Sequence, residues 1–178
     1  MTTPLEGQLP GGYSYRRLRP DDAETLSALR EEMLLDTPLS FLGAPGEDLG
    51  TRPEVNRERL GHPFNCVLGA HDVEGNLVST ATIIRDDRVK LRHKGMIVSV
   101  YTTPRARRRG LQRVLLMALI DYARATPDMD VVQLSVSAEA PGARALYESM
   151  GFVAWGREPR ALRIDGVDRD EVHMSLVL

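Results

Sequence analysis

The sequence predicts an α/β (α+β) protein in which a mixed, mostly antiparallel sheet of about seven strands is flanked by helices. Three observations lead to this prediction: a hairpin pattern over residues 65–86, a long amphipathic stretch after Gly110, and an uncharged β-rich run over residues 131–138. The 178 residues suit one domain with a sizeable core. We expect that domain to span residues 13–178, after a flexible tail over residues 1–12.

The first third of the domain is predicted to hold one strand and two helices. Residues 13–20 alternate apolar and polar side chains and stop at a proline, which is typical of a strand. Asp21 and Glu24 have the spacing of a capping box, so a helix is expected to follow. Its predicted buried face consists of Leu26, Leu29, Met33 and Leu34. The Pro- and Gly-rich segment 37–50 is predicted to be irregular and to border a pocket, before a short helix over residues 52–60.

The middle of the chain is predicted to form three consecutive strands and the main helix. Gly75-Asn76 marks a hairpin turn between two strands, and residues 94–102 add a third. Apolar residues recur at helical spacing after Gly110, so that helix is expected to be largely buried. The residues at this spacing are Leu111, Val114, Leu115, Ala118 and Tyr122.

The last third alternates strand and helix patterns. Residues 131–138 have few charges and many β-branched side chains, as in an interior strand. Pro141 is expected to begin a helix and Gly151 to end it. The apolar face of that helix would be Ala143, Leu146, Tyr147 and Met150. Two more strands are expected, around residues 152–156 and 171–178.

Composition excludes several classes of protein. The formal net charge of −2 lacks the positive excess of a general nucleic-acid binder. No stretch reaches the roughly 18 apolar residues of a membrane span, so no membrane association and a cytoplasmic location are expected. The single cysteine, Cys66, cannot form an internal disulfide and is predicted to be a buried thiol. The four histidines are scattered without ligand spacing, so no metal site is expected.

The segment "RARRRGLQ", residues 105–112, joins the third strand of the hairpin series to the main helix. A helix N-terminus presents unpaired N–H groups and a positive dipole end, and glycine lets the backbone approach a ligand closely. Neighbouring arginines can add charge-assisted bonds to phosphate oxygens. They are Arg107, Arg108, Arg109 and Arg113. A solvated basic turn remains an alternative; RNA binding is less favoured, because no aromatic residues interleave the arginines.

The segment "VYTTPRARRRGLQRVLL" resembles the strand–turn–helix signature of the GNAT acetyltransferase superfamily. The family's turn reads Arg or Gln, two residues, Gly, one residue, then Gly or Ala, and the corresponding positions are Arg107, Gly110 and Gln112. Downstream, "ARALYESMGF" resembles the family's Ala-x-x-Leu-Tyr-Glu-x-x-Gly-Phe segment. The resemblance implies a GNAT fold in which the strands of Val100 and Val131 splay apart to admit acetyl-CoA.

The same resemblance implies roles for individual residues. The turn 108–113 would wrap the pyrophosphate with backbone N–H groups, and the strand end 100–102 would pair with the pantetheine arm and polarise the thioester oxygen. The implied cofactor-binding residues are Val100, Tyr101, Thr102, Arg107, Arg108, Arg109, Gly110, Leu111, Gln112 and Arg113. Tyr147 would be the general acid that protonates the leaving thiolate.

Three positions depart from the family pattern. Gln112 replaces Gly or Ala, and its side chain would crowd the phosphates, point outward or donate to a phosphate. Ala140 replaces an asparagine that commonly bonds the cofactor arm. Ser135 stands where some protein-acetylating relatives carry a basic glutamate. The general base therefore stays open among His93, Glu139, His173 and a water relay, with the water relay preferred.

The resulting hypothesis is an N-acetyltransferase that moves an acetyl group from acetyl-CoA to a primary amine by direct attack in a ternary complex. The acceptor would be a small-molecule amine or a protein amine, in a pocket shaped by residues 36–60 and by an acidic hairpin over residues 158–170. A homodimer is compatible with the resemblance. The alternative is a weakly active or inactive acyl-CoA-binding sensor of the same fold, suggested by Gln112 and Ala140.

Overall fold

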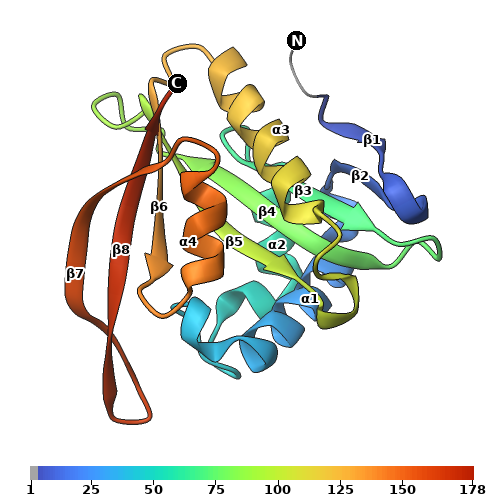
Figure 1. The fold of residues 1–178 in the computed structure, drawn as a ribbon. Helices are drawn as coiled ribbons and strands as arrows, with labels where there is room; N and C mark the ends of the chain where they lie inside the picture. Colours follow the sequence, from blue (N-terminus) through green and yellow to red (C-terminus); the bar gives the residue numbers. More distant parts are fainter. Residues whose placement is uncertain (1–3) are drawn as a thin grey trace.

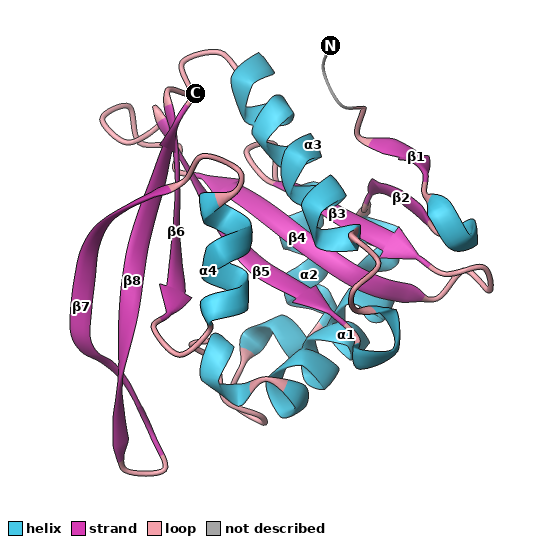
Figure 2. Ribbon diagram, in the orientation of Figure 1, coloured by secondary structure: helices cyan, strands magenta, loops and turns pink. Residues whose placement is uncertain are grey.

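The protein, described here from a computed structural model, contains one open eight-stranded sheet with helices on both faces (Figures 1 and 2). The structure describes residues 4–178. The strands are β1 Glu6–Gln8, β2 Ser14–Arg17, β3 Cys66–His71, β4 Leu77–Arg85, β5 Lys94–Thr102, β6 Val131–Ser137, β7 Val153–Ile164 and β8 Val167–Val177. The helices are α1 Ala23–Asp36, α2 Pro53–Gly61, α3 Leu111–Ala125 and α4 Pro141–Glu148. Short 3-10 turns lie at Pro10–Gly12, Pro20–Asp22, Pro38–Ser40, Leu49–Thr51 and Pro104–Ala106.

The strands run in the order β1-β2-β3-β4-β5-β6-β8-β7, and every neighbouring pair is antiparallel except β5 and β6. This arrangement confirms the predicted mixed, mostly antiparallel sheet flanked by helices. Among residues 4–178, no helix has the length and apolar character needed to cross a membrane.

Strand alternation divides the buried side chains between the two faces of the sheet. Cys66 and Leu68 of β3 belong to the core beneath α3 and α4, whereas Val67 belongs to the core beneath α1 and α2 (Figure 1). Cys66 is fully buried, which confirms the predicted buried thiol, and burial raises the pKa of this thiol to about 11. The predicted buried face of α1 is also confirmed, because Leu26, Leu29, Met33 and Leu34 are all buried.

The N-terminal segment differs from the prediction. Glu6–Gln8 pairs antiparallel with β2, so the expected flexible tail over residues 1–12 does not hold for this strand. The reason is backbone pairing and local packing: Tyr15 donates a hydrogen bond to the Pro4 carbonyl, and Leu5 and Leu9 pack against the core. A strand held in this way shows no alternating apolar and polar pattern in the sequence, so it was not predicted. With β1 the sheet has eight strands instead of about seven. Residues 1–3 lie outside the described part.

Two other local predictions need correction. The carboxylate at the start of α1 is Asp22, which accepts from the Arg19 backbone N–H and from Arg16, so Asp21 is not the capping residue. The final hairpin is longer than predicted, because β7 and β8 extend to a turn at Asp165-Gly166. Their alternating charges pair across the strands. The pairs are Arg157–Asp170, Arg160–Asp168 and Arg163–Asp168.

Candidate active site

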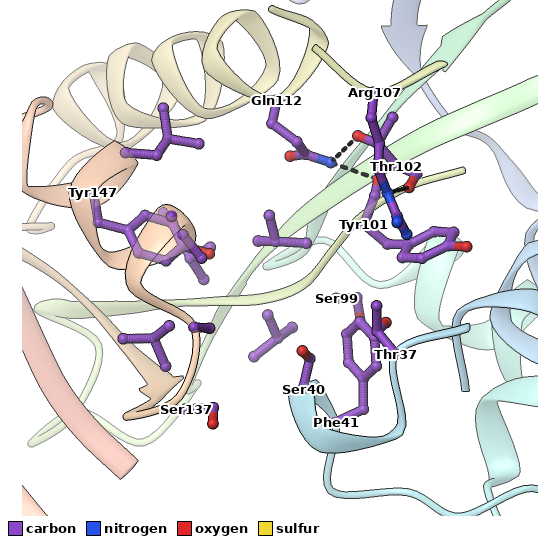
Figure 3. Close-up of a pocket in the computed structure, with 18 of the residues that line it drawn as sticks. Thr37, Ser40, Phe41, Ser99, Tyr101, Thr102, Arg107, Gln112, Ser137 and Tyr147 are labelled. Carbon is purple, nitrogen blue, oxygen red and sulfur yellow. Dashed lines mark hydrogen bonds between the residues drawn. The ribbon is translucent and has the colours of Figure 1, made fainter. Parts of the chain in front are cut away.

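A cavity with a volume of about 980 Å³ lies where β5 and β6 separate (Figure 3). The two strands pair only between Lys94–Met96 and Val131–Gln133. Beyond these residues their facing edges line the cavity, together with the turn before α3, the inner face of α4 and the segment after α1. The predicted splay between the strands of Val100 and Val131 is therefore present.

A β-bulge in β5 contributes to this separation. Tyr101 pairs with Thr80 and Val98 with Thr82, so β5 has one more residue than β4 between these pairs. Ser99 in the bulge has a φ of 54°, in the left-handed region, although it is not glycine. The bulge locally interrupts the regular pairing at Ser99 and Val100, both of which line the cavity.

The arginine turn has the backbone geometry of an anion site. Arg108 and Gly110 both have left-handed φ values, 62° and 76°, and Gly110 is the N-terminal cap of the 15-residue helix α3. Such a turn gathers successive backbone N–H groups at the positive end of the helix dipole. A Cβ at Gly110 would meet no atom within 4 Å, so the backbone angle rather than space demands glycine here.

The arginine side chains have different partners. Arg107 donates to the Thr102 carbonyl at 3.1 Å and forms an ion pair with Asp36. Arg109 lies over the Tyr13 ring, and Arg113 donates to Ser149. Arg108 also lines the cavity, and its side chain makes no hydrogen bond, ion pair or ring contact with residues 4–178. The guanidinium of Arg107 is thus hydrogen-bonded and ion-paired within the protein, and its contact with a phosphate stays a prediction.

Gln112 points into the sheet, contrary to all three orientations considered from the sequence. Its side-chain amide donates to the carbonyls of Thr80 and Tyr101, and its nitrogen also lies 2.9 Å from Ser79 Oγ and 3.1 Å from Thr102 Oγ1 (Figure 3). The side chain therefore ties α3 to β4 and β5 beside the bulge. It does not crowd the turn where the phosphates were expected.

Tyr147 lies on the inner face of α4 and is only 6% exposed. Its ring packs edge-on against Phe152, with 6.0 Å between centroids, and its hydroxyl points toward the cavity (Figure 3). Burial raises the pKa of Tyr147 to about 12, so the hydroxyl keeps its proton at physiological pH. It makes no hydrogen bond with the described part of the chain, which leaves it available to a ligand.

The other half of the cavity is lined mainly by neutral side chains. Thr37, Ser40, Phe41 and Leu42 follow α1, which confirms that part of the irregular segment borders the pocket. No residue of the predicted acidic hairpin 158–170 lines the cavity, so that part of the pocket prediction is wrong. Glu171, the next residue, does line it, and burial raises the pKa of its carboxyl. Sequence reasoning could not single out Glu171, because the neighbouring acidic residues have the same chemistry.

The candidate general bases differ in their position relative to the cavity. Neither His93 nor Glu139 lines the cavity, and Glu139 forms an ion pair with Arg169. Ser135 lines it and is hydrogen-bonded to His173. Ala140, where an asparagine was expected, also faces the cavity.

A sequence profile described as the acetyltransferase (GNAT) family matches residues 26–152, which is more than half of the chain. The chain belongs to the GNAT family of acetyltransferases. This acetyltransferase is 35% identical over 123 residues to N-alpha-acetyltransferase RimI of Mycobacterium tuberculosis, in a match covering 69% of this chain and 73% of the relative. Together, the family and this relative identify an acetyl-CoA-dependent N-acetyltransferase.

Solved structures agree with the fold of this acetyltransferase. A GNAT-family acetyltransferase from Streptococcus pneumoniae has a TM-score of 0.84 and 25% identity, with 93% of this chain and 99% of the other covered. A putative acetyltransferase from Salmonella typhimurium, solved with its cofactor acetyl-CoA, has a TM-score of 0.79 and 23% identity, with 94% of both chains covered.

Replacing Gln112 by Ala is expected to lower the free energy of unfolding by about 1–3 kcal/mol, because buried carbonyls of β4 and β5 lose their donor. Coenzyme A binding, measured by calorimetry, should weaken or stay unchanged. Met117→Ala, on the exposed side of the same helix, is the matched control. Tighter binding by the Gln112 variant at unchanged stability would contradict the structural role assigned to this side chain.

Proposed function

We propose that this acetyltransferase transfers the acetyl group of acetyl-CoA to the free N-terminal amine of a peptide or protein, by direct attack in a ternary complex. The observation that carries the proposal is the cavity at the β5–β6 opening, with an anion-binding turn at one end, Tyr147 on one wall and a mostly uncharged acceptor half.

The residues present fit acetyl-CoA. Backbone N–H groups of the turn 108–113 would bind the pyrophosphate, with Arg108 as the arginine available for a charge-assisted bond. The β5 residues 100–102 run along the cavity and would pair with the pantetheine arm. A backbone N–H at the bulge, nearest Val100 or Tyr101, would stabilise the negative charge that develops on the thioester oxygen.

Tyr147 is proposed as the general acid. Direct attack by an amine expels the coenzyme A thiolate, which needs a proton from a nearby group. The Tyr147 hydroxyl faces the cavity, has no partner in the described part of the chain and stays protonated because burial raises its pKa to about 12. These properties place a protonated hydroxyl on the cavity wall, where it would donate to the sulfur as the C–S bond breaks.

The acceptor class is inferred from the charge of the cavity lining. A polyamine would be held best by several carboxylates, yet Glu171 is the one acidic residue among the described residues that line the cavity. Hydroxyls of Thr37, Ser40 and Ser99 could instead bond a peptide backbone. The relative RimI is named an N-alpha-acetyltransferase, which supports the same class. A sensor is not favoured, since Gln112 points away from the turn.

The proposed activity is tested with acetyl-CoA and three acceptors: a hexapeptide with a free N-terminus, the same peptide with a blocked N-terminus, and spermidine. Thiol release and product mass should show acetylation of the free peptide, none of the blocked peptide, and a lower kcat/KM for spermidine. Tight coenzyme A binding without transfer to any acceptor would instead support the sensor. Preference for spermidine would overturn the acceptor class alone.

Replacing Tyr147 by Phe is expected to lower kcat about 100-fold, because the leaving thiolate loses its proton donor. The Kd for coenzyme A should change little, since the ring and its packing against Phe152 are retained. Phe152→Leu, which alters the same packing without removing the hydroxyl, serves as the control. Full turnover by the Tyr147 variant would show that another group is the acid.

A further inference from the structure

Three polar side chains form a hydrogen-bonded line across β6, β8 and β7. Ser135 Oγ lies 2.8 Å from His173 Nδ1, and His173 Nε2 lies 2.9 Å from Glu158 Oε2. The sheet fixes this order, because Ser135 and His173 are direct partners in the β6–β8 ladder. Both ring nitrogens are therefore occupied by groups on neighbouring strands.

The surroundings hold the His173 ring in one orientation. A register shift between Ala154 and Gly156 of β7 accompanies stacking of Trp155 on the imidazole, with centroids 5.3 Å apart and an interplanar angle of 29°. An ionised Glu158 can only accept, so Nε2 carries a hydrogen and Nδ1 is left to accept from the Ser135 hydroxyl. The array is thus arranged to pass a proton from Ser135 toward His173.

The serine end of this line opens into the active-site cavity. Ser135 lines the cavity, as does Val136, but Leu134 and Val136 belong to the core that also contains Tyr147, and Ser135 does not. Alternate side chains of a strand point to opposite faces of the sheet. Ser135 and Tyr147 therefore approach the β5–β6 opening from opposite sides.

We propose that Ser135, His173 and Glu158 form the proton relay that deprotonates the acceptor amine, a role that rests on the N-acetyltransferase activity proposed above. The bound ammonium gives one proton to the Ser135 oxygen while the Ser135 hydroxyl proton moves to His173 Nδ1. The free amine then attacks the thioester carbonyl, the C–S bond breaks, and Tyr147 protonates the leaving sulfur.

Both protons of the relay and of the acid are accounted for after each turnover. The attacking nitrogen releases its second proton through solvent to the Tyr147 oxygen, which restores the acid. His173 side-chain exposure is 25%, so its extra proton can return to bulk water after each turnover. Glu158 is a positioning residue, because it acts on the reaction through the imidazole, whose positive charge it stabilises.

Glu171 is the competing proton acceptor. It lines the cavity, pairs with Ser137 in the β6–β8 ladder and with Glu158 in the β7–β8 ladder, and burial raises the pKa of its carboxyl. Glu158 is hydrogen-bonded to His173, and the charges of Glu171 and His173 interact. Because both carboxylates lie beside the same ring, the experiment must separate their contributions.

The test compares His173→Gln with His93→Gln, a histidine outside the cavity lining, using acetyl-CoA and the free-N-terminus hexapeptide across pH 6–10. The His173 variant should lose about 100-fold in kcat/KM near pH 7, the contribution expected of a general base. This loss in kcat/KM should become smaller above about pH 9, where the α-amine of the peptide is already deprotonated before it binds. A merely structural defect would not recover with pH. The His93 variant should follow the wild-type profile.

Two further variants complete the experiment. Glu158→Gln should show a smaller loss of kcat/KM with the same recovery at high pH, and exogenous imidazole should partly restore the activity of His173→Gly.

The relay would be overturned if Glu171→Gln showed the pH-dependent loss expected of His173→Gln while His173→Gln itself behaved like the wild type. Acetylation of Ser135 by acetyl-CoA alone, seen by mass spectrometry, would overturn it in favour of a nucleophilic serine. Wild-type protein that acetylates no amine would remove the proposed function as well, whereas a normal His173 variant would remove only the relay.

Discussion

The separation of β5 from β6 is the constraint on which the rest of the site depends. Three residue pairs hold the parallel strands together, after which each strand presents an edge without a neighbour. Unpaired backbone groups of this kind are costly to bury and readily pair with another extended chain. The opening therefore provides both the space for a ligand and the hydrogen-bonding groups that a pantetheine arm needs.

An open strand end needs support from elsewhere, and side chains supply it on both faces. Gln112 donates to carbonyls of β4 and β5, and Arg107 donates to the last carbonyl of β5. On the other face the Tyr101 hydroxyl lies 3.0 Å from carboxylate oxygens of Glu32 and Asp36 in α1. Burial, together with these bonds, raises the pKa of Tyr101. The side chains of Gln112, Arg107 and Tyr101 thus support the open strand end from both faces.

Much of the fold could be predicted from the sequence, because strand alternation and helical spacing report burial directly. The bounds of β5, the hairpin turn at Gly75-Asn76 and the buried face of α1 follow from such patterns. The backbone turn at Gly110 and the placement of Tyr147 could also be anticipated. The orientations of Gln112 and Arg107 could not, since partners such as Thr80 and Asp36 are distant in the sequence. The line from Ser135 through His173 to Glu158 depends on strand register, which no local pattern encodes.

The central claim is that the opening between β5 and β6, capped by the turn at Gly110, is the acetyl-CoA site. A crystal structure of the protein with coenzyme A tests it most directly. The account predicts electron density for the pyrophosphate against the backbone N–H groups of residues 108–113, and for the pantetheine arm along residues 100–102, ending near Tyr147. Coenzyme A bound elsewhere, with the β5–β6 opening closed or filled by protein side chains, would contradict the account.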